Sequence, residues 1–129
     1  MPDLSNSRPT IAVVDDDNAV REATARLVKS VGYNAFTFAS AEDFLKSKKV
    51  HDTSCLITDV QMPGLSGLDL QDRLITNGHR IPIIFITADP DNIVRARAAK
   101  DKDETVCILA KPFRPDHLLD CVKIALSAA

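Results

Sequence analysis

Residues 55–67 read CLITDVQMPGLSG, a short apolar run that ends at Asp59 and passes into turn-forming residues. The run Cys55–Thr58 suits a buried strand, because strands covered on both faces are apolar throughout rather than alternating. A Pro-Gly pair and a second glycine mark the loop that follows, and a helix is expected from about Ser66 to Asn77. The segment therefore predicts a strand that ends in a carboxylate, then a loop, then a helix.

The same order of strand and helix repeats along the chain. Four further segments have the apolar or alternating pattern of strands: Ile11–Val14, Tyr33–Ala39, Ile83–Thr87 and Val106–Ala110. Segments with helical spacing separate them and follow the last one. Apolar strands that alternate with helices predict an α/β fold, a five-stranded parallel sheet with helices on both faces. Residues 1–9 are polar and read as a flexible tail, so the domain is expected over residues 10–127.

Composition narrows the possible partners and location. The chain has 129 residues, with 16 basic and 18 acidic side chains and a formal net charge of −2. This length fits one domain. The near-equal numbers of basic and acidic residues argue against the clustered basic surface that direct nucleic-acid binding needs. The longest apolar run, Ile81–Ala88, is far shorter than the ~20 residues of a membrane span. No secretory signal is visible, and a cytoplasmic protein without membrane contact is expected.

Three cysteines, Cys55, Cys107 and Cys121, lie far apart in apolar segments. An odd number without a close pair argues against a disulfide framework. We therefore expect three buried free thiols in a reducing compartment.

Polar residues follow four of the five expected strands. Asp15-Asp16-Asp17 follows the first, Asp59 ends the third, Thr87 ends the fourth and Lys111-Pro112 follows the fifth. In a parallel sheet the carboxyl ends of the strands share one edge, where ligands bind. Each residue alone has an ordinary structural role, as a helix cap, a β-branched strand residue or a turn. Their common position at strand ends favours a functional site.

Charge suggests what this site holds. Two carboxylates of the first loop and Asp59, opposed by Lys111 alone, leave two negative charges uncompensated. A divalent cation would neutralise them, and Mg²⁺ is favoured because no set of His or Cys ligands accompanies the carboxylates. A neutralised site accepts a phosphoryl group, with a carboxylate as nucleophile, a lysine as point charge and the Thr87 hydroxyl as hydrogen-bond donor.

Four motifs in this order resemble the receiver domain of two-component response regulators over nearly the whole chain. They are Asp15-Asp16, the segment from Asp59 through Met62-Pro63-Gly64 to Gly67, Ile86-Thr87-Ala88, and Lys111-Pro112-Phe113. The resemblance implies the flavodoxin-like (βα)5 fold of chemotaxis receivers. It also implies a signalling domain, rather than an enzyme, that catalyses its own phosphorylation and dephosphorylation.

The resemblance assigns roles residue by residue. Asp59 would accept phosphoryl from a histidine kinase or phosphotransfer protein. Asp15, Asp16, Asp59 and the backbone carbonyl of Gln61 would hold Mg²⁺, while Lys111 and Thr87 would contact the phosphoryl group. The phosphorylated domain would then switch a surface that binds an unidentified protein target.

The resemblance also concerns the neighbours of these residues. Ala88 would leave room for the phosphoryl group, the Lys111–Pro112 peptide bond would be cis, and Gln61 and Asp89 match positions that influence hydrolysis. Asp17 is interpreted as a surface or capping residue. Three other aspartates are expected to be solvated charges: Asp52, Asp69 and Asp72.

Two positions depart from the family pattern. Receivers usually carry Phe or Tyr three residues before the lysine, where this chain has Ile108. The segment Lys100–Glu104 is longer and more charged than the usual link into the last strand. We interpret it as a solvated loop, and the alternative is an altered partner surface beside Arg95 and Arg97.

Two other readings remain open. The Asp15-Asp16-Asp17 spacing also resembles haloacid-dehalogenase-type phosphatases, in which Asp15 would be the nucleophile, although Asp59 and its Met-Pro-Gly would then be unexplained. The chain is alternatively the receiver of a longer DNA-binding regulator. No second domain follows in the sequence, which slightly favours a stand-alone receiver.

Overall fold

A computed structural model describes residues 8–97 and 105–127 and contains a five-stranded parallel sheet in the order β2-β1-β3-β4-β5. The strands are β1 (Thr10–Val14), β2 (Asn34–Phe38), β3 (Cys55–Asp59), β4 (Ile83–Thr87) and β5 (Thr105–Ala110). All four pairings between neighbouring strands are parallel. The structure confirms the predicted fold class, and each strand lies within one or two residues of its predicted position.

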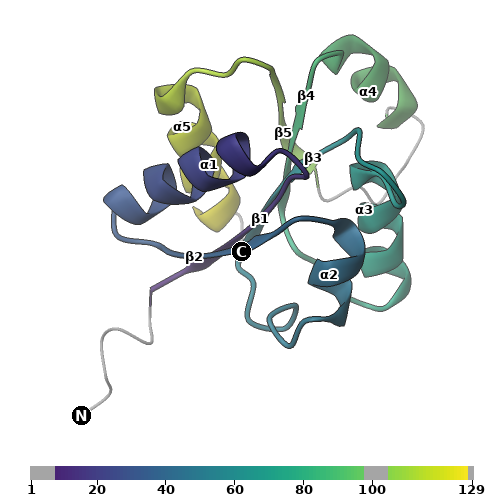
Figure 1. Ribbon diagram of the computed structural model, residues 1–129, viewed down its shortest axis with the longest axis horizontal. Helices are drawn as coiled ribbons and strands as arrows, with labels where there is room; N and C mark the ends of the chain where they lie inside the picture. Colours follow the sequence, from purple (N-terminus) through teal and green to yellow (C-terminus); the bar gives the residue numbers. More distant parts are fainter. Residues whose placement is uncertain (1–7, 98–104, 128–129) are drawn as a thin grey trace.

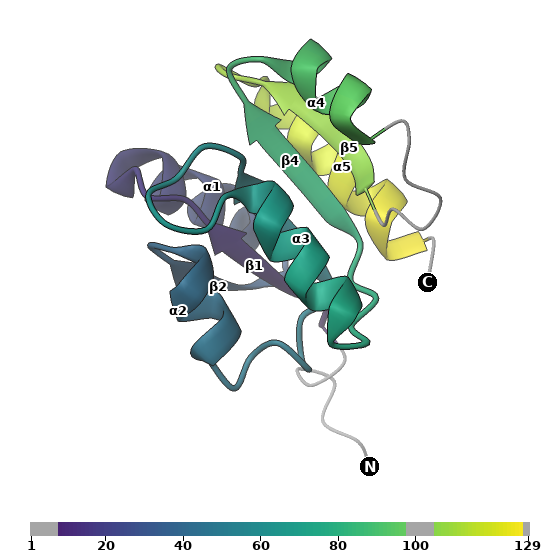
Figure 2. The same ribbon diagram turned by 90° about the vertical axis from the view of Figure 1, so that its right-hand side faces the viewer.

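Five helices alternate with the strands and cover both faces of the sheet. They are α1 (Asn18–Ser30), α2 (Ala41–Lys46), α3 (Gly67–Thr76), α4 (Pro90–Arg97) and α5 (Pro115–Ser127). Figure 1 shows α1 and α5 on one face and α2, α3 and α4 on the other. In Figure 2 the three helices of the second face lie in front of the sheet.

Alternation along each strand divides the core into two layers. In β1, Ile11 and Val13 pack toward α1 and α5, whereas Ala12 and Val14 pack toward α2 and α3. Successive side chains of a strand point to opposite faces, so one apolar run supplies both layers. All four side chains are almost completely buried. This burial explains why the strands of the sequence read as continuous apolar runs.

Local capping sets where two of the helices begin. The Asp17 side chain accepts hydrogen bonds from the backbone amides of Ala19 and Val20, which makes it the N-cap of α1, as predicted. Ser66 and Asp69 form a complete capping box at the start of α3. Asp69 is exposed, as expected of a solvated charge, and it also has a structural role, because its carboxylate accepts the amide hydrogen of Ser66.

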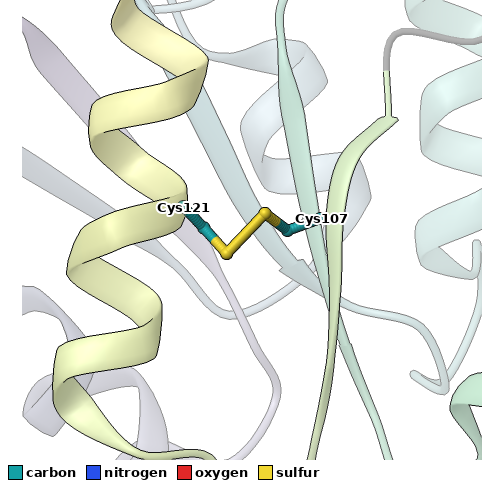
Figure 3. Close-up of a disulfide and its surroundings, with 2 residues drawn as sticks. All are labelled: Cys107 and Cys121. Atoms are coloured by element: carbon teal, nitrogen blue, oxygen red, sulfur yellow. A yellow bond between two sulfur atoms is a disulfide. The ribbon is translucent and has the colours of Figure 1, made fainter.

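The expectation of three free thiols is wrong. Cys107 of β5 and Cys121 of α5 form a disulfide, with their Cα atoms 6.1 Å apart, and Figure 3 shows it joining the strand to the helix. Cys55 alone is a free buried thiol, and burial raises its pKa to about 12. Spacing along the sequence did not reveal the pair, because only the packing of α5 on the sheet brings these residues together.

Some expectations fall on residues that the structure does not describe. These are most of the tail, residues 1–7, and the whole of the charged loop Lys100–Glu104. Among the described residues, none of the helices has the length and apolar character that a bilayer crossing requires.

Candidate functional site

Two of the acidic segments meet where the order of the strands reverses. The chain runs from β1 outward to β2 and then returns to form β3 on the other side of β1. Asp15 directly follows β1, and Asp59 is the last residue of β3. Open parallel sheets bind ligands in the crevice at this switch point, because the loops diverge there.

A cluster of three carboxylates lies at this edge. One carboxylate oxygen from each of Asp15, Asp16 and Asp59 lies within 4.8 Å of the other two. Asp15 and Asp59 are only 2% and 7% exposed, whereas Asp16 is exposed. Three carboxylates from two strand ends are a donor set of hard oxygens, which fits Mg²⁺ better than a softer metal.

Lys111, just after β5, supplies the opposing charge. Its Nζ lies 3.2 Å from Asp59 Oδ2 and 3.5 Å from Asp15 Oδ2. The Lys111–Pro112 peptide bond is cis, as the resemblance implies. One ammonium therefore bridges two of the three carboxylates, and the cluster keeps a net negative charge, as expected from the sequence.

The pKa values at the site reflect this crowding. Burial raises the pKa of Asp15 above its usual range, although the backbone amide of Asp17 and the Lys111 ammonium partly oppose the shift. Burial alone would lower the pKa of Lys111, but Asp15 and Asp59 outweigh it, and the net shift is upward. Lys111 is therefore a firmly protonated cation, and its ammonium compensates the charge of Asp15 only in part.

Thr87 ends β4 beside the cluster. Asp59 pairs in register with Ile86, so Thr87 lies one residue further toward the edge. Its side-chain oxygen accepts a hydrogen bond from the Asp89 amide at 3.1 Å, and its carbonyl accepts one from the Lys111 amide at 2.9 Å. The hydroxyl hydrogen of Thr87 remains a donor at the same edge as Lys111.

The loop after β3 is tied to the sheet near Asp59. The Val60 amide donates to the Ile86 carbonyl at 3.1 Å, and the Gly67 amide donates to the Val60 carbonyl at 2.9 Å. A Cβ on Gly67 would collide with the backbone carbonyl of Asp59, so only glycine allows this close approach. Gln61 lies in this loop and is exposed.

Sequence reasoning missed two side chains that hold these loops. Arg21 Nη1 of α1 donates to the Asp15 backbone carbonyl at 2.7 Å. The Glu42 carboxylate of α2 accepts a hydrogen bond from the Leu65 amide, in the loop after β3. Neither residue lies in one of the motifs, and no sequence signal marked them.

Ile108, at the position where receivers usually carry an aromatic residue, pairs in register with Phe85 of β4. It is partly buried and packs against the core layer on the side of α2, α3 and α4. An isoleucine therefore fills part of this layer.

Comparisons with known proteins agree with this geometry. The family model described as the response regulator receiver domain matches residues 11–123. The chain is 41% identical over 126 residues to the response regulator protein TodT of Pseudomonas putida. This alignment covers 98% of this chain and 55% of TodT. It is 42% identical over 121 residues to nodulation protein W of Bradyrhizobium diazoefficiens, covering 94% of this chain and 52% of that protein. The chain thus spans about half the length of these relatives.

Solved structures show the same fold. The response regulator StyR superposes with a TM-score of 0.84 at 40% identity, over 94% of this chain and 60% of StyR. The structure named FixJ-N superposes with a TM-score of 0.79 at 29% identity, over 100% of this chain and 98% of that one. The match also decides against the phosphatase reading, in which Asp59 had no role. The strand-end cluster and these matches together show that the chain belongs to the family of response regulator receiver domains.

Proposed function

We propose that Asp59 accepts a phosphoryl group from a histidine kinase or phosphotransfer protein and that this modification switches a protein-binding surface. The observation that carries the proposal is the position of the Asp59 carboxylate. It is nearly buried, 3.2 Å from Lys111 Nζ, and one of its oxygens lies within 4.8 Å of one oxygen each of Asp15 and Asp16. A carboxylate held between a cation and a candidate metal site suits nucleophilic attack on phosphorus.

The transfer forms one bond and breaks one. An oxygen of Asp59 forms a bond to phosphorus, and the bond from phosphorus to the donor histidine nitrogen breaks, so the electron pair of that bond returns to the imidazole. Lys111 offsets negative charge on the phosphoryl oxygens, and the Thr87 hydroxyl donates to one of them. Hydrolysis later reverses the modification when water attacks phosphorus and the bond from phosphorus to the Asp59 oxygen breaks. The side chains of Gln61 and Asp89, at the positions that match those influencing hydrolysis, are exposed and lie in the two loops beside the site.

Mg²⁺ fits the donor set. Asp15, Asp16 and Asp59 would hold it together with the backbone carbonyl of Gln61, which lies in the loop after Asp59. The bound ion would supply the positive charge that lets a phosphoryl group enter a cluster of carboxylates. The upward pKa shift of Asp15 supports this assignment, because it marks a carboxylate whose charge the protein alone compensates poorly.

The relatives suggest where this switch acts. TodT is named a response regulator protein, and other relatives are named transcriptional regulatory proteins. We infer a cytoplasmic domain that receives phosphoryl from a kinase and passes the signal to a protein surface rather than to nucleic acid directly. Because the chain spans about half of these relatives, an output domain that binds DNA is a second candidate for the step that follows.

The experiment is intact-mass measurement after incubation with Mg²⁺ and acetyl phosphate. We expect wild type to gain one phosphoryl group and Asp59→Asn to gain none, because the amide oxygen is a poor nucleophile. Asp52→Asn is the matched control, since Asp52 is an exposed aspartate outside the cluster. It is expected to behave like wild type.

Equal phosphoryl uptake by Asp59→Asn and wild type would refute the assignment of Asp59. Uptake by neither protein, with no Mg²⁺ bound in calorimetry, would refute the phosphorylation switch itself. Loss of uptake on Asp52→Asn would show that the measurement reports general damage from removal of a carboxylate.

A further inference from the structure

Glu42, in the first turn of α2, reaches across to the loop that follows Asp59. Its Oε2 accepts a hydrogen bond from the Leu65 amide at 3.4 Å. The same carboxylate occupies the space that a Cβ on Gly64 would need, so it lies directly against the loop backbone. Two neighbouring residues of the loop therefore contact one side chain that comes from 23 residues earlier in the chain.

The N-terminus of α2 has stabilising groups other than Glu42. Ser40 caps the helix by accepting the Asp43 amide, and the exposed Asp43 already places a negative charge at the N-terminus. The Glu42 carboxylate, by contrast, is half-buried, and its Oε1 is buried with no hydrogen-bond partner among the described residues. Burying that oxygen without a hydrogen bond costs free energy, and the contacts of the carboxylate with Gly64 and Leu65 are the structural gain that accompanies it.

The loop is thus held at two points with the expected metal-ligand carbonyl between them. At one end, the Val60 amide donates a hydrogen bond to the Ile86 carbonyl, and the Val60 carbonyl accepts one from the Gly67 amide. At the other end, the Leu65 amide donates a hydrogen bond to the Glu42 carboxylate. Gln61 lies between these two points. Gly64 has a φ of +77°, a conformation that lets the chain turn beneath the Glu42 carboxylate.

We propose that Glu42 is a positioning residue for the phosphoacceptor loop, defined here as residues 60–66. By holding Leu65 and Gly64, it restricts the directions in which the Gln61 carbonyl points, and so it sets the affinity for Mg²⁺ and the rate of phosphoryl uptake at limiting Mg²⁺. This consequence rests on the proposed function, whereas the hold on the loop does not.

The test compares Glu42→Ala and Glu42→Gln with Asp43→Ala. The glutamine keeps an oxygen that accepts the Leu65 amide, whereas alanine removes it. Asp43 is the matched control, since it is an acidic residue of the same helical turn whose side chain is exposed. Three quantities are measured: exchange of the Leu65 amide by NMR, Mg²⁺ affinity by calorimetry without phosphodonor, and the rate of uptake from acetyl phosphate.

We expect Glu42→Ala to bind Mg²⁺ about 2- to 10-fold more weakly, because removal of a direct outer-shell partner of a ligand costs ~10-fold or more and Glu42 contacts Gly64 and Leu65 rather than Gln61 itself. Its Leu65 amide exchanges faster, while amides of the sheet keep their protection. Its phosphoryl uptake is slow at limiting Mg²⁺ and returns to the wild-type rate at saturating Mg²⁺. Glu42→Gln is expected to restore most of the affinity, and Asp43→Ala to leave all three quantities unchanged.

Unchanged Mg²⁺ affinity in Glu42→Ala would overturn the positioning role, and so would unchanged exchange of Leu65. A uniform rise in exchange across the sheet would also overturn it, because Glu42 would then act on stability as a whole. Failure of the proposed function looks different. If wild type binds Mg²⁺ but takes up no phosphoryl, that function fails, while Leu65 exchange and Mg²⁺ affinity still decide the role of Glu42.

Discussion

The fold compensates the charge of Asp15 only in part. Its carboxylate is buried, Lys111 lies 3.5 Å away, and burial still raises its pKa. The folded chain therefore holds the Asp15 proton more tightly than the unfolded chain. Asp15 contributes stability that is fully present below its unfolded pKa and is lost as the pH rises through its folded pKa.

We predict that Asp15→Asn raises the free energy of unfolding at pH 7 in Mg²⁺-free buffer. The variant removes the buried charge and keeps an oxygen that can accept the Asp17 amide. The gain is expected to shrink as the pH falls toward ~3, because wild-type Asp15 is then protonated too. Urea unfolding followed by circular dichroism measures it, since the chain has no Trp.

The control for Asp15→Asn is the exposed Asp52→Asn, which is expected to change stability little. A loss of stability in Asp15→Asn at pH 7 would mean that the ion pair with Lys111 outweighs the cost of burial. The same variant is expected to bind Mg²⁺ more weakly, so stability and metal binding should move in opposite directions.

At the scale of elements, the disulfide connects β5 to α5. β5 leads into Lys111, and α5 buries Leu118, Val122 and Ala125 against the sheet. The bond closes a loop with a sequence separation of 14 residues. A disulfide that closes a loop of about this length lowers the conformational entropy of the unfolded chain. In the chain-entropy account this stabilises the folded state by about 3 kcal/mol.

We therefore predict that Cys121→Ser lowers the free energy of unfolding by about 3 kcal/mol. Dithiothreitol is expected to destabilise wild type by a similar amount and to leave the variant unchanged. The double variant Cys107→Ser, Cys121→Ser tests the cause, because two residues joined by one bond should not give additive losses. Additive losses, or a wild type insensitive to dithiothreitol, would contradict a disulfide in solution.

For the whole molecule, the site links ligand binding to global stability. The carboxylates come from the ends of β1 and β3 and the ammonium from the end of β5, so they come together only when the sheet has formed. A cation bound to the folded state alone stabilises it by about 2.7 kcal/mol at one hundred times its dissociation constant.

We predict that Mg²⁺ raises the melting temperature of wild type and has little effect on Asp59→Asn. Thermal unfolding with and without Mg²⁺ measures this, and Asp52→Asn should respond like wild type. An equal response of all three proteins would assign the effect to general screening of charge rather than to the strand-end cluster.

The fold class and most of the candidate site were predictable from the order of residues. Apolar runs that alternate with helical spacing specify a parallel sheet, and its topology forces the strand ends to one edge. The sequence therefore predicts that Asp15, Asp59, Thr87 and Lys111 lie at that edge. Local signals worked as well, since Asp17 caps α1 as predicted.

Contacts between residues far apart in the chain were decided by packing alone. Cys107 and Cys121 form their bond because α5 lies on β5, and Glu42 meets Leu65 because α2 lies beside the loop after β3. Periodicity shows which face of an element is buried, but it does not show which side chain of another element that face meets. Those pairings depend on how elements pack against one another, which local patterns along the chain do not encode.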